Sequence, residues 1–88
     1  MLRIHRTSGR TIVLTISGHL EADNVIELSH LVDAEPPGGV VVLDLRDLIL
    51  ADRDAVRFLR DHETRGRVVL RNCPAYVRRW MAGENDSP

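Results

Sequence analysis

The apolar segment from Val40 to Leu45, interrupted only by Asp44, constrains the fold of this chain more than any other feature of its sequence. It follows the turn-forming sequence Pro36-Pro37-Gly38-Gly39 and is rich in valine. A short continuous apolar run after such a turn signal is typical of a strand that other elements cover on both faces. We therefore expect an α/β fold with this segment as its central strand.

Two further strands are predicted before the central one. Residues Leu2 to His5 alternate between apolar and polar, Thr7 to Arg10 offer a turn, and Thr11 to Ile16 form a β-branched run. Runs of this kind joined by a short polar turn are typical of a β-hairpin. The chain is therefore expected to open with an antiparallel pair of strands, the second of which ends at Gly18.

A first helix is predicted between the hairpin and the central strand, from about Asn24 to Ala34. Its apolar residues recur at helical spacing, and the prolines that follow stop it. Asp23 or Asn24 can cap its first turn, and Glu27 lies three residues after Asn24, where it completes a capping box. The helix is thus expected to begin close to Asn24.

A second helix is expected from near Asp52 to Gly66, since aspartate favours helix starts and glycine favours helix ends. A strand over Arg67 to Arg71 and a last helix over Ala75 to Met81 follow. The residues of this last helix expected to face the core are Val77, Trp80 and Met81.

These elements predict the order ββαβαβα in a mixed four-stranded sheet covered by about three helices. Connections from one strand through a helix to the next imply parallel pairing of the last three strands, with the first strand antiparallel at the edge. The chain has 88 residues, which suits one domain and one core. We assign residues 1–82 to that domain and residues 83–88 to a polar C-terminal tail.

Composition excludes several classes of function. The formal net charge is −1, which does not favour a nucleic-acid partner, and the basic residues are all arginine, which excludes lysine chemistry. The single cysteine, Cys73, excludes an internal disulfide. No apolar stretch is long enough for a signal peptide or a membrane span, so we expect a cytoplasmic protein with no membrane partner.

Charged residues near the second helix do not form a recognisable catalytic or metal site. Several acids occur there without the spacing of metal ligands, the histidines are scattered along the chain, and no glycine-rich phosphate loop is present. We expect no metal, no cofactor and no enzyme activity. Arg53, Arg57 and Arg60 alternate with acids on the same helix, so a self-paired, solvated face is expected there.

Four segments, in their order and spacing, resemble the STAS family of anti-sigma-factor antagonists. The resemblance covers roughly Leu2 to Met81. The matching segments are Gly18-His19-Leu20-Glu21, Val41 to Leu48, Asp52-Arg53-Asp54-Ala55, and Gly66 to Asn72.

The resemblance implies a regulatory site at the start of the second helix. In the family this junction reads D-S-S-G, and a partner kinase phosphorylates its second serine. Here Asp52 matches the aspartate, Arg53 the first serine, Asp54 the phosphoacceptor serine and Ala55 the glycine. No serine, threonine or tyrosine occurs between His30 and Glu63, so Ser/Thr phosphorylation at the usual junction is not expected. Asp54 is either a fixed imitation of the phosphorylated state or an ordinary first-turn acid.

The resemblance also implies a function and partners. We expect a protein-binding module of bacterial transcription regulation or signalling whose partner is an anti-sigma factor or a related kinase. The alternative is a dimeric or scaffold subunit of a larger complex: the family usually adds a strand and a helix after the last helix predicted here, so an open sheet edge would invite a second copy. The expected partner-binding residues are His19, Glu21, Leu50, Ala51, Asp52, Arg53, Asp54, Ala55 and Arg57.

Overall fold

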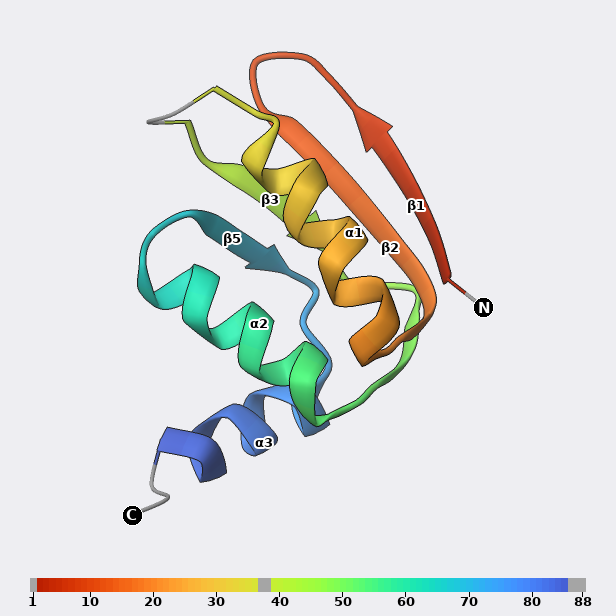
Figure 1. Ribbon diagram of the computed structural model, residues 1–88, viewed down its shortest axis with the longest axis vertical. Coiled ribbons are helices and arrows are strands. Elements are labelled where there is room, and N and C mark those ends of the chain that lie inside the picture. Colours follow the sequence, from red (N-terminus) through yellow and green to blue (C-terminus); the bar gives the residue numbers. More distant parts are fainter. Residues whose placement is uncertain (1, 37–38, 86–88) are drawn as a thin grey trace.

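The computed structural model describes residues 2–36 and 39–85. These form a two-layer α/β domain with a sheet and three helices (Figure 1). In chain order the elements are β1 (Leu2–Thr7), β2 (Ile12–Leu20), α1 (Ala22–Asp33), β3 (Val41–Asp44), β4 (Leu48–Ala51), α2 (Arg53–Thr64), β5 (Val68–Arg71) and α3 (Ala75–Asn85).

The sheet has the predicted class and strand directions. Strand β1 pairs antiparallel with β2 at one edge, β2 pairs parallel with β3, and β3 pairs parallel with β5. The spatial order is therefore β1-β2-β3-β5. The parallel pairs follow from the helical crossovers, which bring the chain back to the same end of the sheet before each new strand.

The prediction of four strands is wrong, because a fifth strand, β4, follows β3 after a short interruption. It pairs parallel with the C-terminal part of β2. The long strand β2 therefore has β3 as its parallel neighbour at first and β4 after that. Gly18, with a φ of 94°, lies where the pairing register shifts, and its N–H donates to the Asp47 carbonyl at 3.2 Å. This glycine therefore lets β2 bend from one neighbour to the next.

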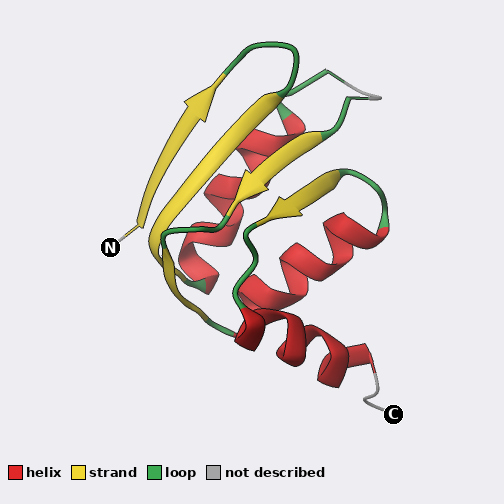
Figure 2. Ribbon diagram, turned by 180° about the vertical axis from the view of Figure 1, so that it is seen from behind, coloured by secondary structure: helices red, strands yellow, loops and turns green. Residues whose placement is uncertain are grey.

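Helices α1 and α2 cover one face of the sheet, as the view from behind shows (Figure 2). The expectation that the central strand is covered on both faces is wrong. Val41 and Leu43 belong to the core beneath the helices, whereas Val42, between them, points to the opposite face. Val42 is nevertheless only 7% exposed, because it lies between Val13 of β2 and Val69 of β5 in the sheet.

Helix α1 begins two residues earlier than predicted. Its N-cap is Glu21, and a reciprocal capping box joins Glu21 to Asn24, whose side-chain oxygen accepts from the Glu21 N–H at 3.2 Å. The predicted box between Asn24 and Glu27 is therefore wrong. Glutamate is an uncommon N-cap, which is why the sequence pattern favoured the asparagine three residues later.

Helix α3 is longer than predicted, since it continues past Met81 to Asn85, and one of the three residues expected in the core lies outside it. Val77 and Met81 are buried as expected, but Trp80 is exposed. Three of the six residues assigned to the polar tail, 83–85, are thus helical, and residues 86–88 lie outside the described part of the chain.

Candidate functional site

The helices α1 and α2 begin side by side at one end of the sheet. Strands β2 and β4 are parallel neighbours with Leu20 beside Ala51, and each is followed almost at once by a helix. The carboxyl ends of parallel strands meet at the same end of a sheet, which is where ligands and partners most often bind in α/β folds. The junction predicted from the sequence therefore includes two helix starts rather than one.

Asp52 joins these two helix starts. Its Oδ1 accepts from the Ala55 N–H of its own helix at 2.9 Å, and its Oδ2 accepts from the Ala22 N–H of α1 at 2.8 Å. Its own N–H donates to the Leu20 carbonyl at 3.1 Å. One carboxylate thus satisfies a donor at the positive end of each helix, so Asp52 fixes the geometry of the junction.

Six of the nine residues predicted to bind a partner present their side chains wholly or partly to solvent around this junction. These are His19, Glu21, Leu50, Arg53, Asp54 and Arg57. Ala51 and Ala55 are 0% exposed and belong to the core, so they support the surface from below. Asp52, the ninth residue, is half-buried and engaged by both helices.

Asp54 lies in the first turn of α2 and is exposed. A negative charge in that turn is stabilised by the helix dipole, by about 0.3 to 1 kcal/mol. At the end of β2, His19 lies near Glu21, the N-cap of α1, with 3.9 Å between the His19 Nδ1 and Glu21 Oε1 atoms. With the exposed Arg53 and Arg57 of α2, charges of both signs therefore surround the junction.

An apolar component at this end of the sheet was only partly predicted. Leu50 of β4 is 48% exposed, and its neighbour Ile49, which the sequence reasoning missed, is 69% exposed. The Tyr76 hydroxyl of α3 donates to the Ile49 carbonyl at 3.3 Å, and burial raises the pKa of this tyrosine. Ile49 was missed because its segment was not recognised as a strand, although two adjacent exposed aliphatic residues were a usable signal.

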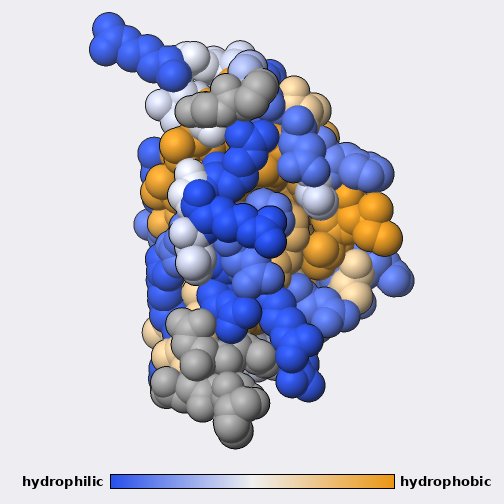
Figure 3. Space-filling view, turned by 60° about the vertical axis from the view of Figure 1, so that its left-hand side comes forward, coloured by the Kyte–Doolittle hydropathy of each residue, from blue (hydrophilic) through white to orange (hydrophobic). Residues whose placement is uncertain are grey.

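The outer face of α2 is polar, as the space-filling view shows: blue covers most of the face toward the reader, with orange at its margins (Figure 3). Arg60 donates to Asp61 at 3.0 Å on this helix. Arg78 of α3 forms a two-point ion pair with Glu63, with nitrogen to oxygen distances of 2.6 and 2.7 Å. Asp61 is thus paired within α2, whereas Glu63 is paired with α3.

Asp44 is separate from the junction acids and has a structural environment. It is buried, and its Oδ1 accepts from the Asn72 side-chain amide and from the Arg46 N–H, both at 3.1 Å. The hydrogen bond from Asn72 is the main cause that lowers the pKa of Asp44. Asn72 adopts a positive φ of 55°, which the contact across the ends of β3 and β5 accommodates.

In the described part of the chain, no group of three or more His, Cys, Asp or Glu side chains is arranged to hold a metal ion. Nor is any helix within residues 2–36 and 39–85 both long and apolar enough to cross a membrane.

Comparison of the structure with solved proteins identifies the fold. The anti-sigma-factor antagonist SpoIIAA in its unphosphorylated form matches with a TM-score of 0.64 and 17% identity, over 90% of this chain and 79% of that one. A DUF3478-family protein of SpoIIAA-like fold from Shewanella loihica PV-4 matches with a TM-score of 0.54 and 15% identity, over 78% of this chain and 65% of that one. Scans against family models and against curated proteins find no match.

The chain therefore has a SpoIIAA-like α/β fold. This confirms the resemblance inferred from the four sequence segments as far as the fold is concerned.

Proposed function

We propose that this protein is a protein-binding module that docks on a partner through the junction of α1 and α2, and that the partner is an anti-sigma factor or a related regulatory kinase. We define the docking surface by its exposed residues His19, Glu21, Leu50, Arg53, Asp54 and Arg57. The observation that carries the proposal is the carboxylate of Asp52, which holds both helix starts in one arrangement beneath these side chains.

The physical basis is a preorganised surface of mixed chemistry. Leu50 supplies apolar area that loses water on contact, while Arg53, Asp54 and Arg57 supply charges of both signs. Because Ala51 and Ala55 are buried in the core, the backbone that carries the surface needs little rearrangement when a partner binds. Such a surface suits recognition of a protein better than chemistry on a small substrate.

The docking surface works without a phosphorylation switch in this proposal. The position that carries the phosphoserine in the resembling family is Asp54, and the segment between His30 and Glu63 has no hydroxyl side chain. A single carboxylate supplies part of the charge of a phosphoryl group at all times. The module therefore stays in one binding state, and regulation rests with its abundance or with the partner.

The test is calorimetric titration with an anti-sigma-factor kinase from the same genome. We expect Asp54→Ala to weaken binding by about tenfold, mainly through slower association at low salt. Asp33→Ala is the matched control, since it removes an exposed acid from the far end of α1 and should leave affinity unchanged. Equal affinities of the wild type and Asp54→Ala would overturn the role of this position.

A second variant tests whether the position of Asp54 is a former phosphorylation site. Asp54→Ser restores a hydroxyl at the junction, and we expect the same kinase to transfer one phosphoryl group to it, seen as a mass increase of the intact protein. Failure of a kinase that binds the wild type to modify this variant would show that the junction is not a former phosphorylation site.

A second candidate function, a dimeric or scaffold subunit of a larger STAS-type complex, is favoured by one observation. Strand β5 lies at an edge of the sheet with Val69 51% exposed.

A further inference from the structure

Strand β5 is the outermost strand on its side of the sheet in both ribbon views (Figures 1 and 2). Among the described residues, it pairs with β3 alone. Its first three residues, Val68 to Leu70, are apolar, and Val69 points away from the helices and is 51% exposed. At the opposite edge, β1 carries two arginines within six residues, Arg3 and Arg6. Charges of that kind protect an edge from pairing, and β5 lacks them in its apolar part.

The backbone of β5 shows which of its groups face outward. The carbonyls of Arg67 and Arg71 accept from Val41 N–H at 3.3 Å and Leu45 N–H at 2.9 Å, on the β3 side. In a strand, the hydrogen-bonding groups of successive residues point to alternate sides. The N–H and carbonyl groups of Val68 and Leu70 therefore point away from β3, toward the open edge.

We propose that two copies of this chain pair through β5 as antiparallel strands centred on Val69. In this register Val68 of one copy lies opposite Leu70 of the other, and each such pair exchanges both of its backbone hydrogen bonds. The two Val69 residues then form the central pair without mutual hydrogen bonds, where side chains lie closest. The register is self-complementary, as a two-fold axis requires.

The same register continues a feature of the uncovered sheet face. Val13, Val42 and Val69 lie side by side across β2, β3 and β5. Pairing of Val69 with its copy extends this row of valines without a break into the second molecule, and it shields the side of Val69 that faces the open edge from water. Cross-strand pairs of β-branched residues stabilise a sheet by about 0.2 to 1 kcal/mol each, which a measured dissociation constant would report as a factor of about 1.4 to 5.

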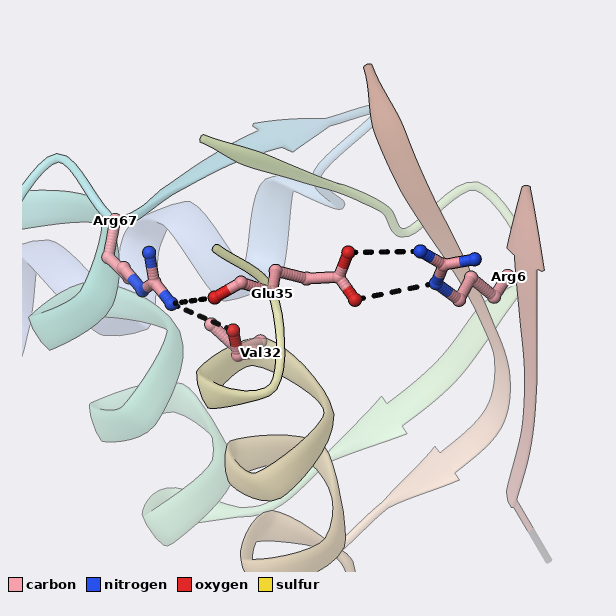
Figure 4. A network of polar contacts seen from close by, with 4 residues as sticks. All are labelled: Arg6, Val32, Glu35 and Arg67. Carbon is pink, nitrogen blue, oxygen red and sulfur yellow. Dashed lines mark hydrogen bonds and ion pairs between the residues drawn. The ribbon is translucent and has the colours of Figure 1, made fainter. Parts of the chain in front are cut away.

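The flanking arginines do not oppose this pairing, although Arg67 of one copy lies opposite Arg71 of the other. The Arg67 guanidinium is directed to the end of α1, where it donates to the carbonyls of Val32 at 2.9 Å and Glu35 at 3.4 Å (Figure 4). The Glu35 carboxylate in turn pairs with Arg6 at 3.0 Å. Arg71 is the register partner of buried Asp44, and its positive charge helps to lower the pKa of that carboxyl. Arg67 thus has hydrogen-bond partners within its own chain, and Arg71 lies beside the carboxylate-bearing Asp44 in the β3–β5 register.

Cysteine cross-linking tests the register directly. In a Cys73→Ala background, Val69→Cys places one thiol in each copy at the central pair, where Cα atoms about 4.5 Å apart suit a disulfide. We expect mild oxidation to convert most of this variant to a covalent dimer of twice 9.9 kDa. Val40→Cys in the same background is the control: Val40 is comparably exposed at 45% but precedes β3, so it should cross-link far less. Equal cross-linking of the two variants would overturn the proposal.

The mass of the wild-type protein in sedimentation equilibrium provides a second test without substitution. We expect a concentration-dependent rise from one copy toward two, and Val69→Lys should raise the dissociation constant by about tenfold or more, because like charges would lie directly opposite each other. A mass of one copy at millimolar concentration would overturn the proposal, and would leave β5 to a strand from a different protein. Because Val69 lies outside the docking surface, Val69→Lys should bind the kinase partner as the wild type does, so the two proposals fail separately.

Discussion

At the scale of single residues, the two acids of the α2 start have different roles despite being two positions apart. Asp52 is held by two backbone N–H groups from two helices, whereas Asp54 is exposed. The sequence predicted an acidic cap here and assigned both residues to partner binding. It did not show the bond from Asp52 to Ala22, because that contact spans 30 residues and depends on the two strands before it.

Substitution should separate these two roles. We expect Asp52→Ala to lower the free energy of unfolding by about 1 to 3 kcal/mol, since it removes a cap and leaves a second helix donor without its acceptor. Asp54→Ala should change it by less than about 0.5 kcal/mol, because an exposed first-turn acid contributes little. Urea unfolding of both variants measures the difference. If the two variants prove equally stable, Asp52 does not join the helices as described.

Asp44 makes a prediction about pH. Its pKa in the folded protein lies below the ordinary value of 3.8, first because of the Asn72 hydrogen bond and also because of the Arg46 N–H, while burial acts in the opposite direction. A group with a lowered folded pKa contributes stability above its unfolded pKa and loses it as pH falls through the folded one. The stability gap between wild type and Asp44→Asn should therefore be constant from pH 7 to about 5 and shrink below about pH 4. Urea unfolding across this range provides the measurement, and a gap that stays constant to pH 3 would contradict the assignment.

At the scale of elements, the predictions were correct where all the residues that determine an element lie within one segment of the sequence. The hairpin, the capped start of α2 and its end at Gly66, with a φ of 72°, follow from nearby residues. Strand β4 was missed because its four residues, two of them exposed aliphatic ones, do not alternate between apolar and polar as a half-buried strand does. Its existence depends on β2, which is long enough to take a second neighbour after the bend at Gly18.

Tyr76 links α3 to this unpredicted strand, and its removal should weaken that link. Tyr76→Phe deletes the hydroxyl that donates to the Ile49 carbonyl and keeps the ring. We expect unfolding to become easier by about 0.5 to 1.5 kcal/mol, the usual net contribution of one hydrogen bond. Hydrogen exchange of the β4 amides should quicken more than that of the β3 amides. Uniform acceleration across the sheet would show that the bond is not specific to β4.

At the scale of the whole molecule, the parallel directions of the later strands followed from the crossover rule, but the order of the strands and the layering did not. The apolar run of the central strand suggested cover on both faces, whereas the helices cover one. Val42 is shielded by valines of neighbouring strands instead. A run of valines therefore predicts that the strand is buried, but it does not predict whether helices or adjacent strands bury it.

The attachment of β4 to β2 has a consequence for how many molecules can assemble. The docking surface lies at β4 and the helix starts, and β4 is joined to the sheet through β2. The edge proposed for dimerisation lies on β5, which is joined to the sheet through β3, so the two surfaces lie on different strands. In the dimer proposed here, we expect both docking surfaces to stay accessible, because neither includes a residue of β5. We therefore expect a complex of two copies with two partner molecules, in which the occupancy of one surface leaves the affinity of the other unchanged.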